Sequence, residues 1–253
     1  MKLLIVGLGS MGKRRARLAK GMDASVEIVG VDSAEARRAE AKELGLVQDA
    51  WASIDEAVTA AHPDAALVCT APLSHAAIIS ELLDHDLPVF TELNLVRDGY
   101  AENMAKAQAK NLPLFLSSTM LYRRETQYIK QAVQNFGKPV HYIYHIGQYL
   151  PDWHPWENYK NFFVGNARTG GVREIFGIDL PWLLDAFGDV EKMTVQTDSI
   201  SDLGLPYPDC ATLLLRHKSG AQGVLAADVV SRKAVRNFEC FGDGLHLFWE
   251  GNP

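Results

Sequence analysis

The sequence predicts an α/β protein: a doubly wound parallel sheet comes first, followed by a smaller α+β domain with an open, largely antiparallel sheet. Two observations predict the first half. A glycine-rich turn separates a strand-like run from a helix-like run at the N-terminus, and strands alternate with helices as far as about residue 119. Beyond residue 120 several strand-like runs are separated by turn residues, which indicates an antiparallel sheet. We therefore expect one domain over 1–119 and a second over 120–253.

The glycine-rich turn follows the apolar run Leu3–Val6 and precedes a basic, helix-like stretch, Lys13–Lys20. Its glycines have the spacing G-x-G-x-x-G, in which the first makes a tight turn and the second lets backbone N–H groups approach a pyrophosphate. The third glycine lets the helix pack close to the strand, and the free N–H groups at the helix start attract an anion. The pattern predicts a Rossmann dinucleotide-binding domain with cofactor contacts at Gly7, Gly9, Ser10, Met11 and Gly12.

A second apolar run, Val26–Val31, ends in Asp32. A carboxylate at this place accepts hydrogen bonds from the adenosine ribose hydroxyls of a dinucleotide. Because it also repels a 2′-phosphate, we expect NAD as the cofactor. NADP stays open as an alternative because Ser33, Arg37 and Arg38 follow.

Further elements of the first domain follow in alternation. Ser53 and Glu56 form a capping box that predicts a helix start. We expect helices at 34–44, 53–61, 74–85 and 98–110, and strands at 64–70, 88–91 and 114–116. In a parallel sheet of this kind the ligand lies at the carboxyl ends of the strands. Those ends carry residues 7–12, Asp32, 70–75 and 91–94, so these segments are expected to meet in one crevice.

The second domain is expected to begin with a helix at 123–136 and a strand at 140–147, followed by an aromatic loop. A helix then runs from 174 or 175 to 187, and strands are expected at 192–197, 211–217, 223–230 and 236–241.

Composition limits the function. The chain has 253 residues, 47% of them hydrophobic and 22% charged, and a formal net charge of −6. This balance argues against nucleic acid or an anionic membrane as the main partner. No apolar run reaches the roughly 18 residues of a membrane span, and no signal peptide is visible. The 3 cysteines are widely spaced, which favours reduced thiols, so we expect a soluble, cytoplasmic protein.

Four segments together carry a family resemblance: Gly7–Gly12, Thr70–His75, Phe90–Leu95, and Gly170-Gly171 with Phe176–Asp179. The chain resembles the glucose–fructose oxidoreductase / inositol dehydrogenase (Gfo/Idh/MocA) family over nearly its whole length. Its second segment is similar to that family's Thr-Pro-x-x-x-His loop, its third stands where the family has Glu-Lys-Pro, and its fourth where it has Gly-Gly-(Gly)…Asp-x-Gly-x-His.

The resemblance implies an NAD(P)-dependent oxidoreductase that acts by hydride transfer on a sugar, sugar nucleotide or cyclitol. It also implies a homodimer or homotetramer formed through the second-domain sheet. The cofactor contacts expected from it are Thr70, Ala71, Pro72, His75 and Glu92. For His75 a packing role is an equal alternative. The family's chains commonly run on for several dozen residues, so either the second domain is reduced or this chain is incomplete.

The chain departs from the family at catalytic positions. Leu93 stands in place of the lysine and Asn94 in place of the proline. One alignment puts Asp179 at the histidine, and a shift by one residue puts Glu174 at the acid. Oxidation of an alcohol needs a group that accepts the hydroxyl proton.

We therefore expect Glu92 to position the cofactor, and His154, Tyr149, Glu174 or Asp179 to accept the proton. Two alternatives stay open: an NAD-binding regulatory or partner protein without turnover, and a non-redox enzyme that keeps NAD tightly bound.

The segment Tyr149–Tyr159 is rich in aromatic residues and also contains Asp152, His154 and Glu157. Aromatic faces beside a few polar groups suit a sugar ring, although such loops also pack on sheets or on partner subunits. The expected substrate-binding residues are Tyr122, Arg123, Tyr149, Trp153 and Arg173, with Arg123 suited to a carboxylate or phosphate. The three polar residues of the loop lack a known metal-ligand spacing, so no metal is expected.

Overall fold

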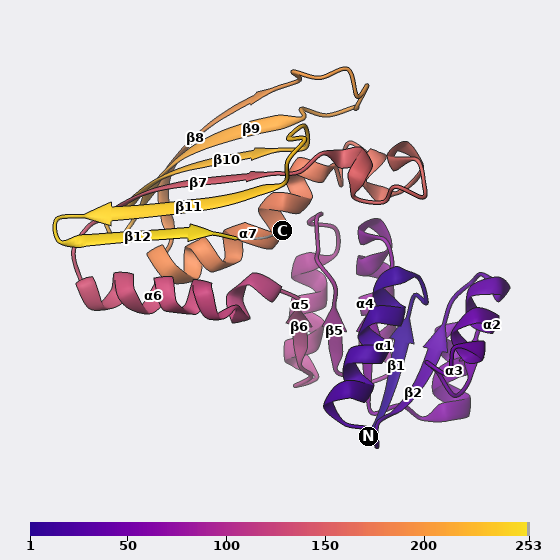
Figure 1. The fold of residues 1–253 in the computed structure, drawn as a ribbon. Helices are drawn as coiled ribbons and strands as arrows, with labels where there is room; N and C mark the ends of the chain where they lie inside the picture. Colours follow the sequence, from indigo (N-terminus) through magenta and orange to yellow (C-terminus); the bar gives the residue numbers. More distant parts are fainter. Residues whose placement is uncertain (252–253) are drawn as a thin grey trace. The chain divides into compact units, whose positions relative to one another are not determined.

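The computed structural model describes residues 1–251. The chain divides into two compact units, one from Met1 to Ser117 and one from Ser118 onward (Figure 1). Each unit has its own sheet.

The first unit is built on a six-stranded parallel sheet. In spatial order its strands are β3 (Ala50–Trp51), β2 (Glu27–Val31), β1 (Lys2–Val6), β4 (Ala65–Val68), β5 (Val89–Thr91) and β6 (Leu114–Leu116). Its helices are α1 (Ser10–Met22), α2 (Glu35–Glu43), α3 (Ile54–Ala61), the short 3-10 helix η1 (Pro72–Ser74), α4 (His75–Asp84) and α5 (Tyr100–Ala109). This arrangement confirms the doubly wound sheet predicted for the N-terminal half.

The strands of this sheet are apolar because both faces are covered. In β1, Leu4 and Val6 enter one buried cluster, whereas Leu3 and Ile5 enter another on the opposite face. The predicted capping box is present at the start of α3, where the Ser53 hydroxyl accepts the Glu56 N–H at 3.3 Å. The two-residue strand β3 was not expected because it is too short to leave a pattern.

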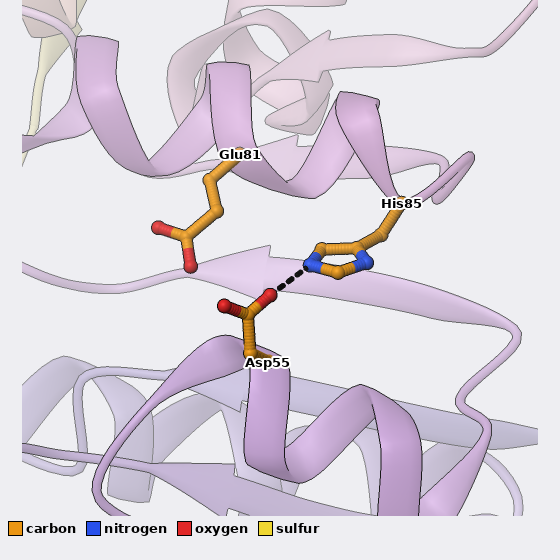
Figure 2. Close-up of side chains that lie close together, drawn as sticks. All are labelled: Asp55, Glu81 and His85. Atoms are coloured by element: carbon orange, nitrogen blue, oxygen red, sulfur yellow. Dashed lines mark hydrogen bonds and ion pairs between the residues drawn. The ribbon is translucent and has the colours of Figure 1, made fainter.

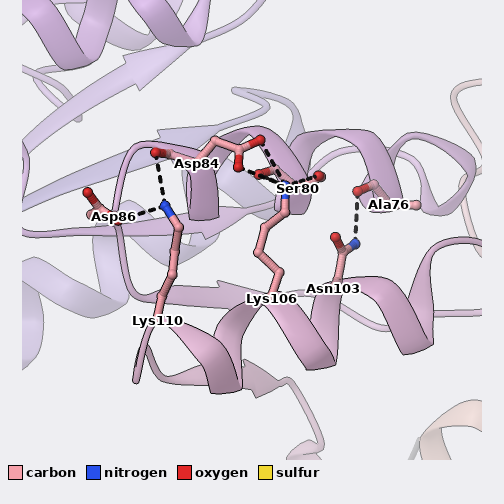
Figure 3. Close-up of polar contacts among 7 residues, drawn as sticks. All are labelled: Ala76, Ser80, Asp84, Asp86, Asn103, Lys106 and Lys110. Carbon is pink, nitrogen blue, oxygen red and sulfur yellow. Dashed lines mark hydrogen bonds and ion pairs between the residues drawn. The ribbon is translucent and has the colours of Figure 1, made fainter.

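Polar contacts join α4 to α5 (Figure 3). The Asn103 amide donates to the carbonyl of Ala76 at 2.9 Å, and the Lys106 ammonium donates to the hydroxyl of Ser80 at 2.7 Å and to Asp84 at 2.8 Å. Lys110 continues the row with an ion pair to Asp86 at 2.7 Å.

The second unit is built on another six-stranded sheet. In spatial order its strands are β12 (Leu245–Glu250), β11 (Val235–Gly242), β7 (His141–Gly147), β10 (Gln222–Asp228), β9 (Cys210–His217) and β8 (Val190–Asp198). The remaining elements are η2 (Thr119–Tyr122), α6 (Arg124–Phe136), η3 (Leu150–Asp152), η4 (Tyr159–Asn161), η5 (Phe163–Gly165) and α7 (Gly171–Phe187). All neighbouring strands are antiparallel except β7 and β10, so the largely antiparallel sheet is confirmed as a mixed one.

One face of this sheet forms the core of the second unit. Tyr142 and Tyr144 of β7 are fully buried and lie in one cluster with Trp182 and Phe187 of α7. Between them along the strand, Ile143 points to the opposite face and is 45% exposed. The sheet therefore has one covered face and one open face.

The structure corrects two predicted elements of this unit. The helix expected from 174 or 175 already begins at Gly171, and β12 follows the last strand that was expected. Among residues 1–251, no helix is long and apolar enough to cross a membrane.

Candidate functional site

The glycine loop after β1 has a geometry that demands glycine at two of its three positions. Gly7 has a φ of +94°, and a Cβ placed on it would lie 2.8 Å from the carbonyl oxygen of Cys69. A Cβ on Gly12 would lie 1.9 Å from the carbonyl oxygen of Gly7, so a larger residue cannot be accommodated. At Gly9 the nearest atom to such a Cβ is 4.0 Å away, on Arg37. The loop is therefore tightly packed against backbone at Gly7 and Gly12, and it has open space at Gly9.

Helix α1 begins in this loop with free backbone donors. Gly9 occupies the N-cap position, and in the described chain no side chain caps the helix. Its first turn contains no acidic residue, and Ser10 and Met11 are exposed. Uncapped N–H groups and the helix dipole together favour a bound anion. This helix start fits the pyrophosphate of a dinucleotide.

Asp32 lies at the carboxyl end of β2 and is only 7% exposed. Its carboxylate accepts the N–H of Leu8, inside the glycine loop, and the N–H of Ala34, both at 2.9 Å. Each carboxylate oxygen has a second lone pair, which can accept a ribose hydroxyl. Arg37 places a guanidinium nitrogen 3.7 Å from this carboxylate.

The segment Thr70–His75 follows β4, as predicted. Pro72 is buried, whereas Ala71 and Leu73 are exposed. His75 is 1% exposed, and its ring nitrogens face the carbonyl of Thr70 at 2.9 Å and the hydroxyl of Thr91 at 3.5 Å. Burial lowers the pKa of His75, so the ring is neutral. These contacts favour the packing role over cofactor contact for this side chain.

Glu92 follows β5 and forms an ion pair with Arg15 of α1. The same guanidinium donates to the hydroxyl of Ser117, which follows β6, at 2.9 Å. The Glu92 side chain is 13% exposed. Sequence reasoning selected Glu92 and missed Arg15, because nothing in the spacing of the helix indicates which strand end it reaches.

The start of α7 holds a half-buried acid, Glu174, whose Oε2 is buried. Burial raises the pKa of Glu174 to about 7, and its Oε2 has no hydrogen-bond partner within residues 1–251. A Cβ on Gly170 would lie 2.7 Å from the ring of Tyr207, and one on Gly171 would lie 3.3 Å from Trp153. The Nε1 of Trp153 is also buried without a partner in the described part of the chain. Two predicted residues, Glu174 and Trp153, thus lie around the same helix start.

Asp179 lies in the core, on a later turn of α7. It is 0% exposed and accepts hydrogen bonds from Tyr144 at 2.6 Å and Trp182 at 3.2 Å. Arg236 forms an ion pair with its other oxygen at 3.3 Å. Burial raises the pKa of Asp179 and the arginine opposes this rise. These contacts place Asp179 in the core of the second unit, and its role in proton transfer stays a prediction.

The aromatic loop places His154 between two rings. Its imidazole stacks on Phe162 at 4.7 Å and on Trp156 at 5.1 Å between ring centroids, and its Nδ1 lies 2.8 Å from Glu157. The loop packs partly against the core of its own unit, which is the alternative that the sequence left open. Tyr149 lies under the guanidinium of Arg232 at 3.7 Å.

The other predicted substrate residues lie at the surface of the second unit. Tyr122 is 67% exposed, and Arg173 is exposed in the first turn of α7. Arg123 pairs with Glu125 at 3.3 Å and lies 5.7 Å from the ring of Trp249.

One group of side chains in the described residues has the composition of a metal site. Asp55, Glu81 and His85 lie together, with His85 Nε2 2.7 Å from an oxygen of Asp55 (Figure 2). Both acids are exposed, and the histidine is engaged with Asp55. We interpret this group as an ion pair between α3 and the end of α4.

The fold and the loop geometry define an NAD-binding protein of the Rossmann class. Residues 1–114 match the family model described as "Oxidoreductase family, NAD-binding Rossmann fold". The first unit therefore matches the family that the sequence motifs indicated, the Gfo/Idh/MocA oxidoreductases.

Relatives of known structure or name match along almost the whole chain. The myo-inositol 2-dehydrogenase of Thermotoga maritima is 27% identical over 270 residues, covering 98% of this chain and 75% of the relative. The WlbA dehydrogenase of Bordetella pertussis, solved with NADH and UDP-GlcNAcA, has a TM-score of 0.87 at 15% identity, covering 99% of this chain and 79% of that one. The structure of myo-inositol 2-dehydrogenase from Lactobacillus plantarum has a TM-score of 0.80 at 17% identity, covering 98% of this chain and 76% of that one. At such identities the structural likeness shows the common fold.

Proposed function

We propose that this protein catalyses hydride transfer between NAD and a secondary alcohol of a sugar, sugar nucleotide or cyclitol. The observation that carries the proposal is the glycine loop with Asp32 bonded into it, because this arrangement fits the pyrophosphate and adenosine ribose of a dinucleotide. The substrate class is supported by the Thermotoga maritima relative, whose name is myo-inositol 2-dehydrogenase.

In this proposal the first unit holds the cofactor. The N–H groups of the first turn of α1 bind the pyrophosphate, Asp32 accepts the adenosine ribose hydroxyls, and Glu92 accepts those of the nicotinamide ribose. Bound NAD supplies the hydride acceptor. Arg37 beside Asp32 supports NADP as the second choice of cofactor.

Glu174 is the proton acceptor that we favour. Its unpartnered oxygen and a pKa of about 7 suit a group that takes a proton from an alcohol at neutral pH. Oδ1 of Asp179 accepts hydrogen bonds from Tyr144 and Trp182, and Oδ2, which has no hydrogen-bond partner in the described residues, is ion-paired with Arg236 at 3.3 Å. His154 is stacked on two rings. Because these two groups are already engaged, they are weaker candidates.

We propose that the second unit also binds the substrate ring. Trp153 offers an aromatic face and an unpartnered N–H close to the start of α7, and Arg173 is exposed in the same turn as Glu174. An aromatic face beside polar groups suits the apolar C–H faces and the hydroxyl groups of a carbohydrate.

The open face of the second-unit sheet is proposed as the contact between copies of the chain. Register places Phe248, Ile143 and Leu214 in one row across the sheet, with Glu239 and Val224 between them, and the three apolar side chains are 66%, 45% and 53% exposed. Apolar side chains gathered on one exposed face favour association, and a two-fold axis pairs the face with itself. A homodimer or homotetramer follows.

A cytoplasmic location is proposed from the cysteines. Cys69, Cys210 and Cys240 are all free thiols. Free thiols are the usual state in a reducing compartment.

The test is a turnover assay on the purified protein. NAD⁺ is incubated with myo-inositol, hexoses and UDP-sugars in turn, and the nicotinamide absorbance of NADH is followed. We expect NADH to accumulate with at least one member of the panel. NADH binding without turnover of any member would favour the alternative of an NAD-binding partner protein, which Leu93 and Asn94 suggest.

The proton acceptor is tested by the pH dependence of the same reaction. In the direction of alcohol oxidation the acceptor must be a carboxylate, so kcat/KM should rise with pH and level off above about 7. Glu174→Gln should lower kcat by roughly a hundredfold or more and remove this rise. Asp185→Asn, an acid near the end of the same helix, serves as the control and should behave as wild type. A normal pH profile in Glu174→Gln would exclude Glu174 as the acceptor.

A further inference from the structure

We propose that Arg15 is a positioning residue that fixes the carboxylate of Glu92 for contact with the nicotinamide ribose. The inference rests on the proposed function, in which Glu92 accepts the hydroxyls of that ribose. It adds a residue that lies outside the G-x-G-x-x-G motif, three residues after Gly12.

The contacts of Arg15 come from two separate segments of the first unit, the end of β5 and the residue after β6. Its Nε forms the ion pair with Oε1 of Glu92, and its second terminal nitrogen donates to the hydroxyl of Ser117 at 2.9 Å. The carbon of its guanidinium lies 5.1 Å from the ring centroid of Phe90. The side chain therefore joins α1, which carries the glycine loop, to the carboxyl ends of β5 and β6.

Burial distinguishes this pair from an ordinary surface salt bridge. The side chains of Arg15 and Glu92 are 20% and 13% exposed, whereas Lys110 and Asp86 elsewhere in the unit are 32% and 77% exposed. Exposed pairs gain little from their attraction, but shielded pairs interact more strongly and lose more when one partner is removed. The hydrogen bond to Glu92 raises the pKa of Arg15, which keeps the guanidinium charged.

The ion pair also determines what Glu92 can do. Arg15 engages Oε1, so Oε2 is the oxygen suited to accept a ribose hydroxyl. The ion pair holds the Glu92 carboxylate in one place, which gives Glu92 an orienting role. Leu93, the next residue, is apolar, so α1 supplies the cation at this strand end.

The test compares two probes that differ in the nicotinamide ribose. Dissociation constants for NADH and for ADP, which lacks this ribose, are measured by calorimetry for wild type, Arg15→Met, Arg15→Lys, Glu92→Gln and the Arg15→Met/Glu92→Gln double variant. Arg17→Met is the matched control, because it removes the same charge from an exposed position of the same helix. Thermal unfolding of each variant accompanies the titrations, and Arg15→Lys provides a milder change if Arg15→Met does not fold.

We expect Arg15→Met to weaken NADH binding about tenfold and to leave ADP binding unchanged. The double variant should bind NADH no more weakly than the weaker single variant, since both substitutions remove the same interaction. Arg15→Lys should bind NADH with intermediate affinity, because a lysine keeps the charge and loses the planar fork.

Three results overturn the inference. If Arg15→Met bound NADH as tightly as wild type while Glu92→Gln bound it more weakly, Glu92 would contact the cofactor without help from Arg15. Equal losses for NADH and ADP would mean that Arg15 supports the whole glycine loop. Additive losses in the double variant would show independent roles. Wild-type protein that binds ADP but not NADH would instead contradict the proposed contact at Glu92.

Discussion

Asp32 and Glu174 are two shielded acids whose surroundings give them different tasks. Asp32 accepts two backbone N–H groups, so its carboxylate is built into the glycine loop. Glu174 lies at a helix start, where the dipole favours the carboxylate, yet burial prevails and raises its pKa to about 7. Asp32 is therefore held in place by two backbone donors, whereas Glu174 has an oxygen without a hydrogen-bond partner in the described residues.

Removal of the Asp32 carboxylate tests its double role. Asp32→Ala should weaken NADH binding by roughly 1–3 kcal/mol, the range for a hydrogen bond to a charged group, and should lower the free energy of unfolding because the buried Leu8 N–H loses its acceptor. Fluorescence titration and urea unfolding measure the two effects. The control Asp23→Ala removes an exposed acid of the same unit. Unchanged NADH affinity would refute the ribose contact.

Sequence reasoning identified single residues where a local pattern determines the role. Gly7, Gly12 and Asp32 belong to a spacing whose physical reason is local, and the structure brings them together as expected. Arg15 and Tyr207 were not found, because their partners, Glu92 and the start of α7, lie far away in the sequence. The burial of Asp179 could not be predicted for the same reason.

The packing of α4 on α5 depends on contacts of unequal burial. Asn103 is 5% exposed and bonds to a backbone carbonyl, whereas the ion pair of Lys106 reaches Asp84, which is 62% exposed. A shielded hydrogen bond contributes about 1 kcal/mol, and an exposed ion pair contributes less.

Two substitutions on α5 compare these contacts. Asn103→Ala should reduce the free energy of unfolding by about 1 kcal/mol, and Lys106→Met by about half of that. Glu102→Ala is the control, at an exposed position next to Asn103, and should change the free energy of unfolding little. Urea unfolding followed by circular dichroism provides the values. A larger loss for Lys106→Met than for Asn103→Ala would contradict this ranking.

Elements were predictable where the pattern was long and repeated. The parallel strands and helices of the first unit follow from apolar runs and helix caps. Helix α7 begins earlier than expected because its glycines, which usually end helices, here admit Tyr207 and Trp153 at close range. The parallel pairing of β7 with β10 depends on contacts between distant segments, which a local pattern does not contain.

The sheet of the second unit has one open face, and we predict that copies of the chain associate through this face. Ile143→Lys places a charge among the exposed apolar side chains of this face and should convert the proposed oligomer to a monomer. Light scattering coupled to size-exclusion chromatography gives the mass. Met22→Lys, an equally drastic change at the 89%-exposed end of α1, should leave the mass unchanged. An Ile143→Lys protein of wild-type mass would exclude this face as the contact.

The two units contribute different parts of the proposed function. The first unit supplies a cradle that fits a dinucleotide, and the second supplies the half-buried acid Glu174 and aromatic side chains. The cofactor half of the chain follows the family pattern closely, whereas the catalytic positions depart from it at Leu93, Asn94 and Asp179. Cofactor binding therefore has to be established before any search for a substrate.

The most direct measurement is a fluorescence titration of the purified wild-type protein with NADH. We expect saturable binding at one site per chain, with the tryptophan emission quenched and the NADH emission enhanced. Absence of NADH binding by folded protein would contradict the cofactor assignment on which the proposed function and the role of Arg15 both depend.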